Sequence, residues 1–372
     1  MLIKHAKVFQ ENGKFAPGDI PISGQFFADT APDCDVIDAA GCYAIPGLID
    51  LHIHGCVGHD FSATDAQGLR DMARYLAANG ITAICPTLLT LPEDQLTAAC
   101  RQIAAHADPK GAAFAGIYLE GPFLSPKKCG AQNPAYIQPP DAELVRRLQA
   151  EAWDMVKLLA IAPEMDGALE LIDALGGEIA CSVAHTEANY ELAQTAFAHG
   201  ARQVTHLFNA MPGLHHRDPG VIGAALDTPD CRAELICDGV HVHPSAVRAA
   251  LRMFGDDRII FISDNMAATG MADGIYDLGG LAVQVRGRQA CLAENNTIAG
   301  SVVNLMDCLR TAVTEMDIPL ATAVKCASVN PAKALGLFHQ RGSITPGKYA
   351  DLVLLNEDLS IRAVFLRGER IG

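Results

Sequence analysis

The sequence lacks both a surplus of basic residues and a long hydrophobic run. Its 372 residues include 43 acidic and 28 basic ones, which gives a formal charge of −15. Nucleic acids and anionic membranes bind proteins through basic surfaces, so neither is an expected partner. No apolar run approaches the roughly 20 residues needed to span a bilayer. The start, Met1–Phe9, is too short and too polar for a signal peptide, so we expect a cytoplasmic protein.

Cysteine is frequent, but the spacing typical of cysteine sites is missing. None of the twelve cysteines forms a Cys-x-x-Cys pair, and without a secretion signal a disulfide framework is not expected. Most of them, such as Cys85 and Cys237, lie in apolar runs, where a free cysteine behaves as a small hydrophobic residue. Cys56 differs because it directly follows a His-x-His-Gly segment, although a small residue in a tight loop is the interpretation that we favour for it. We expect reduced, structural cysteines.

From Pro46 onward, apolar runs alternate with amphipathic stretches that predict helices, for example over 65–78, 92–107 and 187–198. The apolar runs predict eight strands: Leu48–His54, Thr82–Thr87, Phe114–Glu120, Val156–Ala162, Ile179–His185, Gln203–Phe208, Glu234–Asp238 and Ile259–Ser263. Continuous apolar strands are expected where helices cover both faces of a parallel sheet. Eight such units over about 290 residues predict an α/β fold, a (β/α)8 TIM-like barrel. A doubly wound open sheet is the alternative, but no Gly-x-Gly-x-x-Gly follows a first strand.

Both ends of the chain read differently from this middle part. Residues 1–45 show short strands and a hairpin turn at Asn12-Gly13-Lys14, with no helical period. At the other end, helices are predicted over 302–316 and 331–336, followed by strands Leu352–Leu355 and Ala363–Arg367. Because neither end can bury much core alone, we predict that 1–45 and 341–372 form one small β-sandwich domain. The catalytic barrel would then comprise residues 46–340.

Histidines and carboxylates recur at the predicted exits of the barrel strands. His52 and His54 are two residues apart on a strand, so they point to the same side. On its own, this pair is as compatible with packed or surface histidines as with half of a metal site. The other exits add Glu120, His185, His206 and Asp264, although Glu120 could cap a turn and Asp264 could be an ordinary loop residue. Barrel active sites lie at the carboxyl ends of the strands, so all six would converge there.

Imidazole and carboxylate ligands without thiolate suit zinc, iron, manganese or cobalt in a catalytic site. Six ligands exceed the needs of one catalytic zinc, which suggests two divalent metals with Glu120 as the bridging carboxylate. A metal pair can generate hydroxide near neutral pH and polarise a carbonyl. Asp264 is placed to take the proton from that water and to pass it to a leaving group. The sequence therefore predicts a metal-dependent hydrolase.

Several phrases of the sequence resemble the amidohydrolase superfamily and, within it, the family of N-acetylglucosamine-6-phosphate deacetylases. They are Pro46–Gly55, Leu119–Phe123, His206–Met211, Asp238–His241, Ser263–Gly270, Ala299–Ser301 and the late Gly-Lys-Tyr-Ala-Asp-Leu segment. His-x-His is shared across the superfamily, whereas Glu-Gly-Pro-Phe and His-Leu-Phe-Asn-Ala-Met are specific to the deacetylases. The resemblance covers essentially the whole chain. It implies hydrolysis of N-acetyl-D-glucosamine 6-phosphate to D-glucosamine 6-phosphate and acetate.

The resemblance also implies roles for single residues. It places the metal ligands at Glu120, His185 and His206, and the catalytic aspartate at Asp264. Some family members lack the His-x-His pair and bind one metal, so its presence here implies two metals.

The implied substrate contacts are the backbone of Asn209 and Ala210, the side chain of His241, and Arg217 for the phosphate. In the family, this arginine reaches across from a neighbouring subunit, which implies a homodimer.

One position departs from the family pattern. Many members carry Gly-x-His-Asn-Pro after the Glu-Gly-Pro segment, and that histidine hydrogen bonds the substrate carbonyl; here the phrase contains Gln132 instead. Gln132 can donate a neutral hydrogen bond to a developing oxyanion, but it cannot carry a charge.

Other readings remain open. The substrate could be a related N-acetyl-hexosamine, such as N-acetylgalactosamine 6-phosphate or an unphosphorylated sugar. A cyclic amidohydrolase would need a carboxylated lysine at the exit of strand 4, where the sequence has Ala162-Pro163-Glu164 and places Lys157 at the entry instead. A non-catalytic barrel should have lost ligands, and none of the six is missing.

Overall fold

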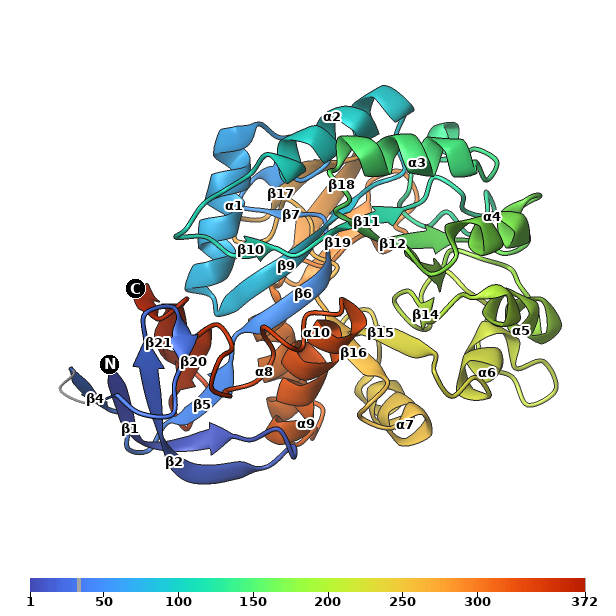
Figure 1. Cartoon of the computed structure of the whole chain (residues 1–372). Helices are drawn as coiled ribbons and strands as arrows, with labels where there is room; N and C mark the ends of the chain where they lie inside the picture. The colour runs from blue at the N-terminus through green and yellow to red at the C-terminus, as the bar shows by residue number, and fades with distance from the viewer. Residues whose placement is uncertain (32–34, 372) are drawn as a thin grey trace.

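A parallel barrel ringed by helices carries a second sheet, built from both chain ends, at its side (Figure 1). The computed structural model describes residues 1–31 and 35–371. The barrel strands are β6 (Leu48–Ile53), β9 (Ile81–Leu88), β11 (Ile117–Glu120), β12 (Val156–Ile161), β13 (Ala180–Val183), β14 (Gln203–Val204), β15 (Arg232–Ile236) and β16 (Ile259–Ile262). Each pairs with the next in parallel.

The barrel is nearly closed. The Asp264 backbone N–H, just after β16, donates to the carbonyl of His52 on β6 at 3.0 Å, which joins the last strand to the first. Strands β6 and β9 are buried at every residue, as expected when helices cover the outside of a parallel sheet. The predicted (β/α)8 fold class is confirmed, and the open sheet is not.

Helices follow most barrel strands and form the outer ring of Figure 1. They are α1 (Ala66–Ala78), α2 (Glu93–Ala104), α3 (Ala142–Glu151), α4 (Ala168–Leu175), α5 (Tyr190–His199), α6 (Gly220–Leu226), α7 (Pro244–Phe254), α8 (Leu305–Thr314), α9 (Leu320–Val324) and α10 (Asn330–Ala334). A short 3-10 turn (Pro134–Tyr136) and a π-helical turn (Lys325–Val329) complete the helical segments. Two predicted helices begin about three residues late, because the side chains of Asn189 and Asn304 cap α5 and α8.

Several predicted strands are shorter than expected, and the reason is the backbone at their exits. The predicted strands ending at His185 and Phe208 stop at Val183 and Val204. His185, His206 and Phe208 have φ angles of +43°, +30° and +79°, and a left-handed residue cannot continue a strand. The predicted strand Phe114–Glu120 is also broken, into β10 (Ala113–Phe114) and β11. The break includes Gly116, where a Cβ would come within 2.6 Å of Lys157.

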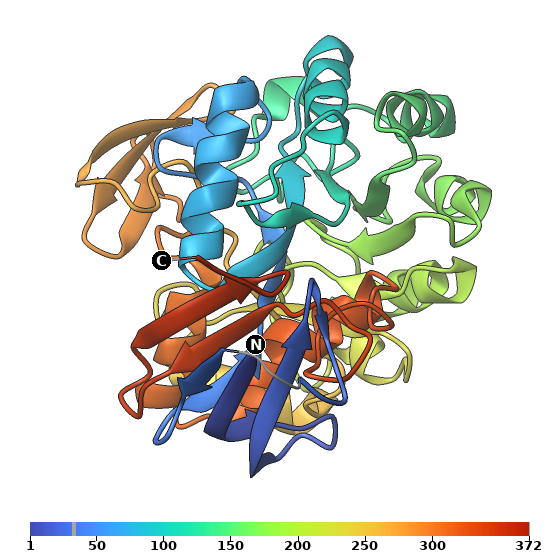
Figure 2. The ribbon, with the colours of Figure 1, turned by 60° about the vertical axis from the view of Figure 1, so that its left-hand side comes forward.

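Both chain ends build one sheet beside the barrel. Its strands are β1 (Leu2–Phe9), β2 (Phe15–Ser23), β3 (Phe26–Phe27), β4 (Val36–Asp38), β5 (Tyr43–Pro46), β20 (Leu352–Leu355), β21 (Ile361–Leu366) and β22 (Glu369–Ile371). The antiparallel pair β5–β20 joins the two ends, and Figure 2 shows these blue and red strands side by side. The sheet has its own core, which includes Ile3, Phe27 and Phe365. A β domain from both termini is therefore confirmed, while the boundaries at residues 45 and 341 stay a prediction.

A small antiparallel flap was not predicted. It consists of β17 (Gly274–Leu278), β18 (Leu281–Arg286) and β19 (Gln289–Leu292), and Figure 2 shows it in orange beyond α1. Gly279 and Gly280, with φ of +58° and +84°, form its first turn. Two glycines between alternating strands are a strong hairpin signal, so the sequence did contain the information. A second small hairpin pairs β7 (Gly55–Cys56) with β8 (His59–Asp60).

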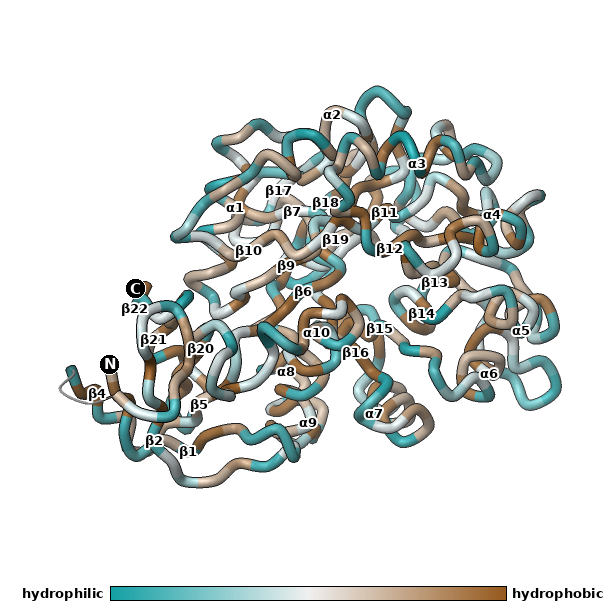
Figure 3. The backbone as a smooth tube through the Cα atoms, in the orientation of Figure 1, coloured by the Kyte–Doolittle hydropathy of each residue, from teal (hydrophilic) through white to brown (hydrophobic). Residues whose placement is uncertain are grey.

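Hydrophobic residues follow the barrel strands and the inner faces of the helices, whereas hydrophilic ones gather in the outer loops (Figure 3). No helix in the described ranges is long and apolar enough to cross a membrane. The eleven cysteines in those ranges are all free, and most are buried, including Cys56. None of these eleven therefore forms a disulfide in the structure, and their reduced state stays a prediction; Cys34 lies outside the described residues.

Candidate active site

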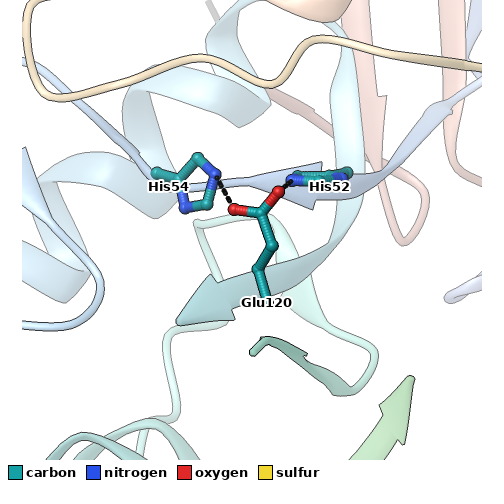
Figure 4. Close-up of side chains that lie close together, drawn as sticks. All are labelled: His52, His54 and Glu120. Carbon is teal, nitrogen blue, oxygen red and sulfur yellow. Dashed lines mark ion pairs between the residues drawn. The ribbon is translucent and has the colours of Figure 1, made fainter. Parts of the chain in front are cut away.

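The His-x-His pair and Glu120 meet at the mouth of the barrel. His52 lies on β6, His54 directly follows it, and Glu120 is the last residue of β11. The Glu120 carboxylate lies between the two rings, with Oε1 3.4 Å from His52 Nε2 and Oε2 3.2 Å from His54 Nε2 (Figure 4). All three side chains are buried. The geometry supports the reading of His52 and His54 as ligands rather than as surface histidines.

The same carboxylate also reaches a second pair of histidines. Glu120 Oε1 lies 3.2 Å from His185 Nε2 and 3.1 Å from His206 Nε2, and these two nitrogens are 3.0 Å apart. Two groups of three ligands, His52/His54/Glu120 and Glu120/His185/His206, thus share Glu120. This is the position expected of a bridging carboxylate. Asp264 completes the centre, since its Oδ1 lies 3.2 Å from His54 Nε2.

The residues fit divalent metals. His52 Nε2 is buried and makes no hydrogen bond within the described part of the chain, although it points at the shared carboxylate. An unpaired buried polar atom needs an explanation, and a lone pair aimed at a cation is one. Four imidazole nitrogens converging on two carboxylates form the donor set that zinc, iron, manganese and cobalt accept.

Hydrogen bonds from the Nδ1 atoms of three of the histidine rings orient these ligands. His54 Nδ1 donates to the Thr87 carbonyl at 3.2 Å, and His185 Nδ1 donates to the Lys128 carbonyl at 2.8 Å. His52 Nδ1 donates instead to the carboxylate of Glu234 at 2.8 Å. A proton fixed at Nδ1 makes Nε2 the nitrogen through which each of these rings would bind a metal.

Electrostatics at the centre favour positive charge. Burial lowers the pKa of His54, but the hydrogen bonds to Asp264 and Glu120 raise this pKa by a larger amount, so that it lies at about 10. Burial raises the pKa of Glu120, yet the charge of His52 and hydrogen bonds from His185 and His206 bring it well below its ordinary value. Buried carboxylates kept ionised in this way attract cations.

A cavity of about 540 Å³ opens above the centre. The predicted site residues among its lining are His54, Glu120, Gln132, His185, His206, Asn209, Ala210, His241 and Asp264. His52 lies beneath them and is fully buried. The lining also includes Lys127 and Lys128, which sequence reasoning missed, and Leu278 of the flap.

The fold family is decided by a match along most of the chain, since the model of the amidohydrolase family matches residues 43–371. This chain belongs to the amidohydrolase family.

Within the family, several relatives of this chain carry the same name. N-acetylglucosamine-6-phosphate deacetylase from Bacillus subtilis is 39% identical over 330 residues, covering 87% of this chain and 83% of the relative. The protein of that name from Bos taurus is 34% identical, with 93% and 87% covered. A solved structure of the Mycobacterium smegmatis enzyme, a mutant in complex with N-acetyl-D-glucosamine-6-phosphate, is 35% identical with a TM-score of 0.93 and covers 100% and 98% of the two chains. The resemblance predicted from the sequence is confirmed.

The cyclic-amide branch of the amidohydrolase family lacks support in this structure. Lys157 is the second residue of β12, at the end of the barrel opposite the site. Its Nζ donates to the Asp154 carbonyl at 2.8 Å in an exposed position. It therefore cannot bridge metals at the strand exits.

The residue that departs from the family pattern sits against the shared carboxylate. Gln132 Nε2 donates to Glu120 Oε2, and its Oε1 accepts from the Thr90 backbone N–H at 2.8 Å. An amide nitrogen carries two protons, so one stays available for a substrate. A hydrogen bond from Gln132 to the substrate carbonyl stays a prediction.

Two predicted substrate contacts, His241 and Arg217, differ in their position relative to the cavity. His241 lines the cavity, with Nδ1 2.7 Å from Asp238 and Nε2 2.8 Å from the Ala299 carbonyl. Burial lowers the pKa of His241, but the hydrogen bond and charge of Asp238 raise it above its ordinary value. Arg217 is exposed, donates to His216 Nε2 at 2.7 Å and is not among the cavity-lining residues. Its contribution to a neighbouring subunit stays a prediction.

Sequence reasoning missed Glu234, the partner of His52. The residue lies in β15 and is fully buried. The available signal was a single acidic residue inside the apolar run Ala233–Cys237, since an ionised side chain is almost never fully buried unless it is paired.

Proposed function

We propose that this chain hydrolyses the acetamide of N-acetyl-D-glucosamine 6-phosphate to D-glucosamine 6-phosphate and acetate. The observation that carries the proposal is the centre organised around Glu120, with Asp264 beside it at the floor of the cavity. The relatives at 34–39% identity are deacetylases of that substrate, which supports the same chemistry here.

The centre would hold two divalent metals, of zinc, iron, manganese or cobalt. His52, His54, Glu120 and Asp264 would hold one, and Glu120, His185 and His206 the other. Bound metals supply Lewis acidity, which acidifies water and polarises the amide carbonyl.

Asp264 moves the proton. Its carboxylate lines the cavity and is only slightly exposed. It accepts a proton from the attacking water and delivers it to the amide nitrogen as the C–N bond breaks. The oxygen of the water ends in the carboxyl group of the acetyl product, and the second proton of the water passes from that carboxyl group to the amine, so acetate and the ammonium form of the amino sugar leave and atoms and charge balance. The second amide proton of Gln132 supports the developing oxyanion.

Cations on the wall of the cavity would receive the phosphate. Lys127 pairs with Glu187 at 3.1 Å, whereas within the described ranges no hydrogen bond or ion pair engages Lys128 Nζ. Two lysines at the cavity of a chain with a charge of −15 suit an anionic substrate. Arg217 would add a planar fork for the phosphate from the neighbouring subunit of a homodimer.

The test is acetate release after metal removal and reconstitution with each metal separately. The panel contains N-acetyl-glucosamine, -galactosamine and -mannosamine, each with and without 6-phosphate. The proposal expects metal-dependent release that is fastest with N-acetyl-D-glucosamine 6-phosphate. No release with any metal would contradict the hydrolase, and faster turnover of another sugar would reassign the substrate. The cytoplasmic location stays a prediction, which cell fractionation would test.

A further inference from the structure

Glu234 is a buried carboxylate that contacts the metal centre from behind. Its Oε2 accepts from His52 Nδ1 at 2.8 Å and from the His206 backbone N–H at 3.3 Å. Its Oε1 accepts from the side-chain amide of Gln203 at 2.6 Å. The residue is fully buried. One carboxylate thus reaches a residue from each half of the centre, His52 on one side and His206 on the other.

The charge of Glu234 has no permanent counter-ion. Its donors are an imidazole, a backbone amide and a side-chain amide, and within the described ranges no lysine or arginine is paired with it. A buried anion without a nearby cation is costly. The place where positive charge can accumulate is the far side of the His52 ring, where Nε2 faces Glu120 and Asp264.

Among the four histidines, His52 alone has a carboxylate behind it. The outer nitrogens of His54 and His185 donate to backbone carbonyls, and His206 Nδ1 makes no hydrogen bond with a described residue. A carboxylate behind a histidine fixes its tautomer and makes its metal-binding nitrogen more basic than a carbonyl does. The ring of Tyr118 also packs edge-on against His52, with centroids 5.0 Å apart. The orientation of His52 is therefore set on two sides.

We propose that Glu234 is the positioning residue that holds His52 for the metal of the His52, His54, Glu120 and Asp264 group, which we call the second metal. The charge of Glu234 then determines whether the centre binds two metals or one. This inference rests on the two-metal centre proposed above. The three carboxylates Glu120, Asp264 and Glu234 carry three negative charges. Two divalent cations balance these charges with one positive charge to spare, whereas a single cation leaves the buried centre negative. The pair His185 and His206, with Glu120, does not depend on Glu234 for side-chain orientation and would retain its metal.

The test measures metal binding rather than activity. Glu234→Gln keeps the shape and can still accept from His52 Nδ1 if Gln203 turns its amide, so it removes mainly the charge. We expect the metal of the Glu120, His185 and His206 group to bind as in the wild type, and the metal held by His52 to bind about 10- to 100-fold more weakly. Glu234→Met removes the acceptor as well and should bind one metal per chain. With Co²⁺, the visible absorption should reduce to the contribution of a single site.

Two further variants separate this role from a general effect on folding. Gln203→Glu combined with Glu234→Gln puts the charge one side chain further from His52, and it should restore part of the lost affinity. Asp108→Asn is the matched control, because Asp108 is a buried carboxylate paired with Arg74 away from the centre, and it should bind two metals normally. Thermal unfolding of the metal-free proteins checks folding; if Glu234→Met fails to fold, Glu234→Gln and the double variant decide.

The outcomes keep this inference and the proposed function apart. Two metals bound with unchanged affinity in Glu234→Gln overturn the role of Glu234 and leave the hydrolase intact. A wild-type chain that takes up only one metal overturns both the two-metal centre and this role. Loss of the second metal without rescue by the double variant also counts against a role for the charge.

Discussion

At the scale of single residues, unusual backbone and functional side chains coincide. His185, His206 and Asp264 have φ angles of +43°, +30° and +50°. Such conformations cost of order 1–3 kcal/mol each for residues other than glycine, and surrounding contacts must hold them. Asp264 is held on both sides: its N–H donates to the His52 carbonyl at 3.0 Å, and its carbonyl accepts from the Ser301 N–H at 2.7 Å. The ligands are thus aimed by the backbone as well as by their side-chain partners.

The proton transfer by Asp264 is tested by Asp264→Asn. The amide has the same shape and keeps an oxygen for the centre, but it cannot accept a proton at neutral pH. We expect kcat to fall by about 10²- to 10⁴-fold with metal content retained, measured by acetate release and metal analysis on the same sample. Asp273→Asn, at an exposed aspartate before β17, is the control and should behave as wild type. Near-normal turnover of Asp264→Asn would rule out its role as the base.

The pair Asp238–His241 predicts a pH-dependent stability. Burial raises the pKa of Asp238, but the hydrogen bond and charge of His241 lower this pKa by a larger amount. The contribution of Asp238 to the stability of the fold is therefore present above the pKa of an unfolded aspartate, about 3.9. The pKa of His241 is raised, so its contribution is complete below about 6.5 and is lost as the pH rises through the folded-state value. The pair therefore stabilises the fold most between about pH 4 and 6.5.

Asp238→Asn should remove this contribution. Breaking a buried pair costs about 3–5 kcal/mol, and the loss should be largest near pH 5.5 and smaller at higher pH. Urea unfolding of the metal-free protein across this range measures it. Asp317→Asn, at an exposed residue 3.7 Å from Arg248, should show little change at any pH. An equal loss at pH 5.5 and 9 would show that the charge of His241 is not involved.

At the scale of elements, the flap forms part of the wall of the cavity. Leu278, the last residue of β17, lines the cavity, and the Gly279 carbonyl accepts from the Asn133 side chain at 3.3 Å on the opposite wall. The Gly279-Gly280 turn therefore links the hairpin to the loop that carries Gln132. Its geometry therefore matters to the shape of the cavity, and the turn itself carries none of the predicted metal ligands.

Gly280→Val tests this link. Gly280 has a φ of +84°, where a β-branched residue is strained by about 1–3 kcal/mol. We expect faster amide exchange over residues 274–292 and a higher KM, with unchanged metal content. Gly13→Val is the matched control, since Gly13 has a φ of +75° in the β1–β2 turn of the terminal sheet. If Gly280→Val leaves KM unchanged, the flap does not shape the substrate site.

At the scale of the whole molecule, the terminal sheet completes the fold and a second subunit is predicted to complete the site. Strand β5 pairs antiparallel with β20 in the terminal sheet, and the chain continues from β5 into β6. The strand that carries His52 therefore starts where the terminal sheet ends. Arg217 is exposed and lies outside the lining of its own cavity. We therefore predict that Arg217 contacts the phosphate from a partner copy.

Arg217→Ala tests this arrangement. Losing a charged hydrogen bond to the phosphate costs about 1.5–3 kcal/mol, so KM for the 6-phosphate should rise about 10- to 100-fold, while KM for the unphosphorylated sugar should barely change. Arg252→Ala, at an exposed arginine of α7, is the control. Light scattering of both variants reports the oligomeric state. Equal effects on both sugars would remove the phosphate assignment, and a monomeric wild type would remove the shared site.

The sequence by itself determined the barrel and the ligand types, because buried parallel strands are mostly apolar and five of the eight predicted strands end in or near a histidine or carboxylate of the site. Apolar runs such as Leu48–His54 and Ile179–His185 could be found without a structure, and so could His52, Glu120 and Asp264 at their exits. Only the tertiary structure decided that the single carboxylate of Glu120 serves both histidine pairs and that Glu234 lies behind His52. Glu234 follows His52 by 182 positions in the chain, and only closure of the barrel brings them within 2.8 Å.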